Sequence, residues 1–158
     1  MMAQNVRLGL EEYATSTYIK KDVDENYEKL KVTLSELDAD YRVAVENTEH
    51  KTIVVATSTL KYLEKFGLNV ICIDNDATDK TVSDASELIS NGEISYLYTF
   101  EGDELNDKAK QLLADYPDLK EQKLHKLNIL TDSDRTNKKN YINIMNNNLD
   151  LIKQELYQ

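Results

Sequence analysis

Short runs of consecutive apolar residues, separated by stretches with helical spacing, constrain this chain more than any other feature of its sequence. Two of them, Thr52–Ala56 and Val70–Ile73, are dominated by apolar residues, as is typical of parallel strands buried on both faces. Ile94–Phe100 and Leu124–Leu130 are predicted as a third and a fourth strand. The alternation of strands and helices predicts an α/β fold, with a four-stranded, mostly parallel sheet and helices on both faces.

Amphipathic spacing predicts helices between and after these strands. One covers Leu60–Phe66 and stops at Gly67, and another covers Leu105–Tyr116 and is closed by Pro117. A third is predicted to open at Thr81–Asp84, which resembles a capping box. The last helix places its apolar residues on one face, namely Ile142, Met145, Leu149, Ile152 and Leu156.

The first 46 residues are expected to form a helical segment, and residues 47–158 the α/β lobe. A long helix is predicted over Asp22–Val45, because its apolar residues recur every three or four positions. This stripe is too short for a typical coiled-coil seam, so we expect it to pack on the domain. It consists of Tyr27, Leu30, Leu34, Leu37, Tyr41 and Val45.

The formal net charge of −10 argues against nucleic acid or an anionic membrane surface as a partner, because neither attracts a polyanion. No segment approaches the roughly 18 apolar residues of a membrane span. The start, Met1–Asn5, lacks the regions of a signal peptide and a cysteine that could carry a lipid. The single cysteine, Cys72, lies in an apolar run, where inert core packing is expected. These features fit a cytoplasmic protein, and also a secreted protein whose front part has been removed.

The sequence carries no motif of a known catalytic class. It has no G-x-S-x-G elbow, no phosphate loop and no G-x-G-x-x-G fingerprint. Its two histidines, His50 and His125, stand in polar company. The pair Asp74 and Asp76 could belong to a magnesium-dependent phosphoacceptor site. Such a site also needs a Lys at the end of a later strand, and Asp132 stands at that place instead. We therefore expect a protein that is not an enzyme.

Acidic residues gather where the predicted strands end. Glu101 follows the third strand, and Asp132 follows the fourth. Ligands of parallel sheets bind beyond the carboxyl ends of the strands, and a divalent cation could meet carboxylates at this edge. Asp is also an ordinary turn and helix-cap residue, so composition alone leaves caps and ligands both open.

Several segments together resemble the zinc- and manganese-specific solute-binding proteins of ABC importers. Thr57–Leu68 is similar to a strand–helix unit of that family, and Tyr98–Gly102 resembles a strand end of its zinc branch. Leu130–Asp134 resembles the family's Thr-Asp turn, and Tyr141–Leu149 the Tyr-x-x-x-Met-x-x-Asn-Leu helix that follows it. Ala3–Leu10 resembles the start of the helix that joins the family's two lobes. The likeness covers nearly the whole chain and rests on the order and spacing of these segments.

The resemblance implies a two-lobed receptor, periplasmic, or extracellular as a membrane-associated lipoprotein, that passes metal to an ABC permease. Its N-terminal lobe, which normally supplies two histidines, is not expected within this chain. Its C-terminal lobe normally supplies a His or Glu after the first strand, where Thr57 or Ser58 stands. Neither is a good zinc ligand. The family's acidic ligand in the Thr-Asp turn is matched by Asp132, and Glu101 is added because of its place at a strand end.

We therefore expect the C-terminal lobe of a zinc- or manganese-binding receptor, with Asp132 and Glu101 as metal ligands and the metal only weakly held. The alternative is a protein-interaction module of the same fold that has lost metal binding. A homodimer is also expected, in which residues 2–13 pack on the other chain. The reason is that this helix presents apolar surface that a partner could cover, at Val6, Leu8, Leu10 and Tyr13.

Overall fold

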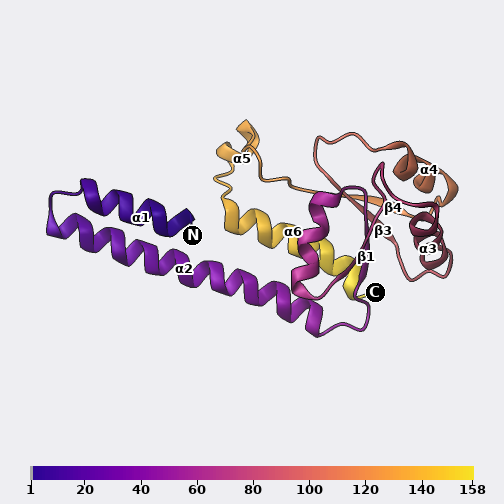
Figure 1. Cartoon of the computed structure of the whole chain (residues 1–158), viewed down its shortest axis with the longest axis horizontal. Helices are drawn as coiled ribbons and strands as arrows, with labels where there is room; N and C mark the ends of the chain where they lie inside the picture. The colour runs from indigo at the N-terminus through magenta and orange to yellow at the C-terminus, as the bar shows by residue number, and fades with distance from the viewer. Residues whose placement is uncertain (1) are drawn as a thin grey trace. The chain divides into compact units, whose positions relative to one another are not determined.

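The computed structural model describes residues 2–158, and four parallel strands in it form one sheet (Figure 1). The strands lie in the order β2-β1-β3-β4, and every pairing is parallel. Their bounds are β1 Thr52–Val55, β2 Asn69–Cys72, β3 Tyr96–Phe100 and β4 Lys120–Leu124. The predicted α/β fold with a four-stranded parallel sheet is therefore confirmed.

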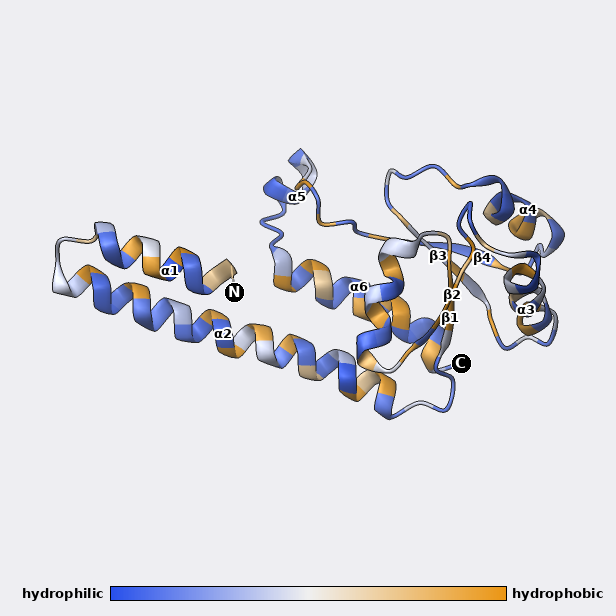
Figure 2. Ribbon diagram, in the orientation of Figure 1, coloured by the Kyte–Doolittle hydropathy of each residue, from blue (hydrophilic) through white to orange (hydrophobic). Residues whose placement is uncertain are grey.

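One face of the sheet packs against two helices, α3 (Asp79–Ser90) and α4 (Asp107–Asp115). Val54 of β1 lies opposite Leu97 of β3 in the register, and both side chains are fully buried in this layer. Ala109 of α4 is fully buried as well, and its small side chain allows the helix to lie close to the sheet. In Figure 2 hydrophobic residues occur along β1 and on parts of α3 and α4.

The opposite face of the sheet packs against α6 (Tyr141–Leu156). The hydroxyl of Tyr98 in β3 donates a hydrogen bond to the Leu151 carbonyl oxygen of α6 (3.1 Å). Near the end of α6, the buried carboxylate of Glu155 accepts from the backbone N–H of Ser95, just before β3 (3.0 Å). Helices therefore cover both faces of the sheet, as predicted.

A 3-10 helix, η1 (Ser58–Phe66), leads from β1 toward β2. It begins after Thr57, whose hydroxyl accepts from the Thr59 backbone N–H (3.4 Å), and it ends at Gly67. Gly67 has φ of 98°, a left-handed conformation that glycine adopts without steric cost. The predicted stop of this helix at Gly67 is confirmed.

The chain separates into two compact units, one ending at Asp40 and one comprising Tyr41–Gln158. The first contains α1 (Met2–Tyr13) and the larger part of α2 (Thr17–Glu46). The last turns of α2 belong to the second unit, where the Tyr41 ring stacks on that of Phe66 at 4.7 Å between centroids. Within residues 2–158, no helix is both long enough and apolar enough to span a membrane.

Within the first unit, α1 contacts α2 through charge rather than through an apolar core. Arg7 Nε lies 2.7 Å from the Asp24 carboxylate of α2, and its guanidinium lies over the Tyr27 ring at 5.1 Å. None of the residues of α1 is buried. Its large apolar side chains, such as Leu8 and Tyr13, are exposed instead.

Several element boundaries differ from the prediction; α2, for example, begins at Thr17 rather than at Asp22, and β3 at Tyr96 rather than at Ile94. The fourth strand lies at Lys120–Leu124, not at 124–130. It is an edge strand in which only Leu124 is buried, so it needs few apolar residues and its sequence does not reveal it. Helix α3 begins after the N-cap Thr78, whose hydroxyl accepts from the Thr81 backbone N–H (3.1 Å), rather than at Thr81.

Candidate functional site

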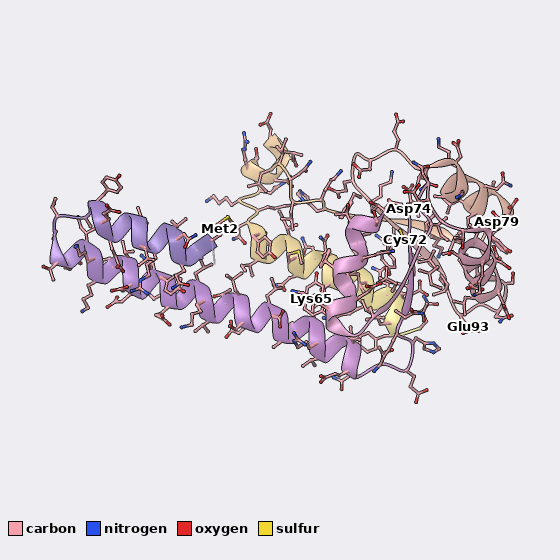
Figure 3. All side chains as sticks on the ribbon, in the orientation of Figure 1. Met2, Lys65, Cys72, Asp74, Asp79 and Glu93 are labelled. Carbon is pink, nitrogen blue, oxygen red and sulfur yellow. The ribbon has the colours of Figure 1, made fainter. Side chains whose placement is uncertain are left out.

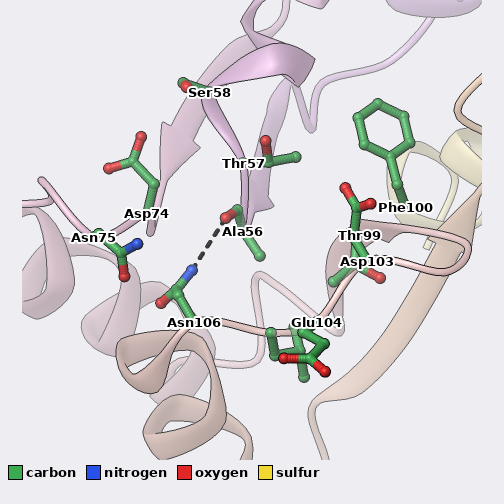
Figure 4. Close-up of a pocket in the computed structure, with 11 residues that line it drawn as sticks. Ala56, Thr57, Ser58, Asp74, Asn75, Thr99, Phe100, Asp103, Glu104 and Asn106 are labelled. Carbon is green, nitrogen blue, oxygen red and sulfur yellow. Dashed lines mark hydrogen bonds between the residues drawn. The ribbon is translucent and has the colours of Figure 1, made fainter. Parts of the chain in front are cut away.

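The sheet reverses its direction of growth between β1 and β3, because β2 lies on one side of β1 and β3 on the other. Ligands of open α/β sheets bind at such a switch point, beyond the carboxyl ends of the strands. A cavity of about 280 Å³ lies there (Figure 4). It is lined by Ala56, Thr57, Ser58, Asp74, Asn75, Thr99, Phe100, Asp103, Glu104, Leu105 and Asn106.

Asn106 organises the floor of this switch-point cavity. Its side-chain Nδ2 donates to the carbonyl oxygens of Ala56 (3.1 Å) and Ile73 (2.8 Å), which follow β1 and β2. The first of these bonds is drawn in Figure 4. Its Oδ1 accepts from the Ala109 backbone N–H (2.9 Å) and caps the N-terminus of α4. One side chain therefore ties two strand ends to a helix start.

Two of the carboxylates that line this cavity, Asp74 and Asp103, are engaged in a turn and in an ion pair. Asp74 accepts from the Asp76 backbone N–H (3.1 Å) and from the Cys72 thiol (3.4 Å), and Figure 3 labels Asp74 and Cys72 together. Burial, with a smaller effect of Asp74, raises the pKa of Cys72 to about 11, so the thiol stays protonated at neutral pH. Both oxygens of Asp103 accept from the Lys126 ammonium (2.9 Å each).

Glu101, the first of the two predicted metal ligands, lies directly after β3 and is exposed. Its backbone N–H donates to the Leu124 carbonyl oxygen (2.9 Å). It lines a second cavity, of about 330 Å³. The other lining residues are Lys123, His125, Lys139, Ile144, Asn147, Asn148, Asp150 and Leu151.

Asp132, the second predicted ligand, stands in the first turn of α5 (Asp132–Thr136) with a fully exposed side chain. Its ion pair with Arg135 is long, at 3.7 Å. Asp132 lines neither of the two cavities described above. Across residues 2–158, the structure brings together no three His, Cys, Asp or Glu side chains in an arrangement that could hold a metal ion.

A neighbouring carboxylate, Asp134, is the one that the structure buries, and sequence reasoning did not single it out. It is 3% exposed, and it accepts hydrogen bonds from Thr131, His125 and Lys139. The hydrogen bond from Thr131, followed by those from Lys139 and His125, lowers the pKa of Asp134 well below its ordinary value. The pair Thr131 and Asp134 forms a capping box, and that spacing is the local signal that could have found it.

The family model of zinc-uptake complex component A, periplasmic (ZnuA), matches residues 1–155 of the chain. No curated protein sequence matches it. Among solved structures, the Zn(II)-bound ZnuA-like domain of AdcA from Streptococcus pneumoniae is similar, with 23% identity and a TM-score of 0.70. The metal-dependent lipoprotein YcdH from Bacillus subtilis has 22% identity and a TM-score of 0.74.

Each of these two similarities covers 98% of this chain and 59% of the similar protein. AdcAII from Streptococcus pneumoniae gives the same picture, with 18% identity, a TM-score of 0.69, and coverage of 98% of this chain and 57% of that one. At these identities the similarity shows a shared fold. The chain spans about 59% of the length of the first two structures.

Proposed function

Since the chain belongs to the ZnuA family of periplasmic zinc-uptake components, we propose that it is the C-terminal lobe of a zinc- or manganese-binding receptor of an ABC importer. Members of the family are metal-binding solute-binding proteins rather than enzymes. The match over residues 1–155 and the shared fold with Zn(II)-bound AdcA support the proposal. In this role the lobe captures a divalent ion outside the cytoplasm and passes it to a membrane permease.

Asp132 and Glu101 supply the metal ligands of this lobe in the proposal. What supports them is their position in the sequence after β4 and β3, together with side chains that are exposed to solvent. Zinc prefers four ligands and favours nitrogen and sulfur over oxygen. Two carboxylates therefore make an incomplete site, and Thr57 and Ser58 add only hydroxyl groups. The isolated lobe accordingly binds zinc or manganese weakly.

Calorimetric titration of the purified chain with Zn(II) and, separately, with Mn(II) tests this proposal. We expect a dissociation constant above about 1 μM, and at least about tenfold weaker binding for Asp132→Asn. Asp107→Asn is the matched control, because Asp107 also stands in the first turn of a helix, is fully exposed and pairs with a cation at 3.7 Å. Submicromolar zinc binding by the monomer, or unchanged binding in Asp132→Asn, contradicts the proposal.

A second function, self-association, is favoured by the exposed apolar side chains of α1. Met2 is 83% exposed and Leu8 52% exposed. The polar residues Arg7 and Glu11 occupy the side of α1 that contacts α2. Apolar surface of this kind is commonly covered by a partner, and a symmetric dimer is the commonest solution. We propose a homodimer in which residues 2–13 pack on the other chain.

A further inference from the structure

The segment between β4 and α6 has no fully buried apolar side chain. Among residues 125–140, Asp134 alone is buried. Ile129 is 68% exposed, and Leu127 and Leu130 are only half-buried. Loops of globular proteins usually stay in place by burying apolar side chains. Residues 127–138, which we call the α5 segment, must therefore be held mainly by polar contacts.

The Asp134 carboxylate gathers these polar contacts from both ends of the α5 segment. Its Oδ2 accepts from the backbone N–H of Thr131 (2.9 Å), from the Thr131 hydroxyl (2.7 Å) and from His125 Nε2 (3.1 Å). Its Oδ1 lies 2.9 Å from the Lys139 ammonium. His125 comes before the segment and Lys139 directly after it, so the carboxylate joins its two ends.

His125 is itself fixed, both in its ring and in its backbone. Its Nδ1 accepts from the Leu127 backbone N–H (3.0 Å), so the proton of the neutral ring lies on Nε2 and points to Asp134. Its backbone is paired with the buried Asn148 of α6. A continuous chain of hydrogen bonds therefore runs from α6 through His125 to Asp134.

The backbone at both limits of the α5 segment is strained. Leu127 has φ of 63° and Lys138 has φ of 52°. They are the two non-glycine residues among those described that adopt positive φ. Such conformations are sparsely populated and persist where surrounding contacts hold them. The positive φ of Lys138 belongs to the C-terminal end of α5, where the backbone N–H groups of Lys138 and Lys139 donate to the carbonyl oxygens of Arg135 (3.0 Å) and Asp134 (2.8 Å). The Leu127 backbone instead depends on His125, because its N–H donates to His125 Nδ1 (3.0 Å).

A helix cap by itself does not need these contacts. The other capping box of the described chain, between Asn140 and Asn143 at the start of α6, consists of two exposed side chains that bond each other's backbone N–H groups. The box at Thr131 and Asp134 adds His125 and Lys139, which lie outside the helix. The additional partners indicate a role in tertiary structure.

We propose that the buried Asp134 carboxylate is a latch, in the sense that its hydrogen bonds hold residues 127–138 against the lobe. By holding this segment, Asp134 acts as a positioning residue for Asp132 in metal binding. The latch itself rests on the contacts above, and the positioning of Asp132 rests on the proposed function. Two carboxylates two residues apart thus have separate tasks: Asp134 holds the segment, and Asp132 stays free for an ion.

Amide hydrogen exchange of the full chain without metal tests the latch. In Asp134→Asn one acceptor oxygen is replaced by an amide nitrogen that faces a donor, and the negative charge is lost. We therefore expect amides such as those of Thr131, Arg135 and Lys139 to exchange at least about tenfold faster. The amides of β1 should not change. Asp132→Asn removes the same charge from an exposed position and should leave exchange as it is in the wild type. Equal exchange in Asp134→Asn and wild type overturns the latch.

Two substitutions of His125 show which contact matters. The side chain of Gln in His125→Gln is long enough to place its amide donor where Nε2 contacts Asp134. The shorter side chain of Asn in His125→Asn reaches only the position of Nδ1, near the Leu127 N–H. We expect exchange close to that of the wild type for His125→Gln and fast exchange for His125→Asn. If Asp134→Asn does not fold, the two His125 variants still test the latch in the same exchange experiment. Fast exchange in both variants, or in neither, contradicts the role of the Nε2 contact.

Titration of the same variants with Zn(II) separates the latch from the proposed function. We expect weaker zinc binding in Asp134→Asn and His125→Asn, with recovery in His125→Gln. If Asp134→Asn frees the segment but binds zinc like the wild type, the positioning role is wrong. If Asp132→Asn binds zinc like the wild type, the proposed metal ligand is wrong, while the exchange results still decide the latch.

Discussion

The side chain of Asn148 forms two reciprocal hydrogen bonds with the backbone of His125. The His125 N–H donates to Asn148 Oδ1 (2.9 Å), and Asn148 Nδ2 donates to the His125 carbonyl oxygen (3.0 Å). His125 directly follows the edge strand β4, so it lacks a neighbouring strand on one side. The Asn148 side chain forms the hydrogen bonds that a neighbouring strand would otherwise form with this backbone. This role explains why an Asn stands at this position of α6.

Replacement of this side chain should therefore be costly. In Asn148→Asp one donor becomes an acceptor that faces a carbonyl oxygen in a buried setting, and we expect the free energy of unfolding to fall by about 2 kcal/mol. Urea unfolding measures this change. Asn147→Asp introduces the same charge at an exposed neighbour and should change the free energy by less than about 0.5 kcal/mol. If both substitutions lower the free energy of unfolding equally, the added charge alone explains the loss of stability, and the two hydrogen bonds of Asn148 do not.

Asn106 offers a parallel test at the switch-point cavity. Asn106→Asp keeps the acceptor that caps α4 but removes the donor to the carbonyl oxygens of Ala56 and Ile73. We expect a loss of about 2 kcal/mol in thermal or urea unfolding. Asn140→Asp is the control, because Asn140 is also an N-cap but is exposed. If Asn106 acted only as a helix cap, Asn106→Asp and Asn140→Asp would change the stability equally. That result would contradict a stabilising role for its bonds to Ala56 and Ile73.

The stability of the lobe should depend on pH through Asp134. Its folded-state pKa is lowered by the hydrogen bonds from Thr131, Lys139 and His125, relative to an ordinary value of 3.8. The stabilisation is therefore fully present above the ordinary value and is lost as the pH falls below it. We expect the difference in unfolding free energy between wild type and Asp134→Asn to be constant from about pH 5 to 7 and to shrink below about pH 4. Urea unfolding at a series of pH values measures it, and a difference that stays constant to about pH 2.5 argues against the assignment.

The proposed homodimer predicts a change of mass in solution. Light scattering at tens of micromolar should give a dimer for the full chain and a monomer for Leu8→Glu, because a charge replaces exposed apolar surface on α1. Ile129→Glu is the control, since Ile129 is 68% exposed and lies in the α5 segment. A monomeric mass for the wild type removes the proposal. Dissociation by the control variant as well would place the contact elsewhere.

The sequence alone determined the architecture of the lobe. Continuous apolar runs such as Ile53–Val55 leave no polar face, so the sheet needs helices on both sides and its strands run parallel. Gly67 and Pro117 likewise punctuate their helices through backbone geometry that acts locally. Such features are readable because each depends on residues close together in the chain.

The tertiary structure decided where β4 lies and that Asp134, which the sequence marks only as a member of a capping box, is buried. The polar run Lys120–Lys123 becomes a strand because β3 presents a free edge to it, and no local pattern records that pairing. Asp132 and Asp134 have the same chemistry and stand two residues apart in one short helix. Only the folded chain brings His125 and Lys139 to one of them and solvent to the other, because hydrogen bonds between distant residues depend on the fold rather than on sequence spacing.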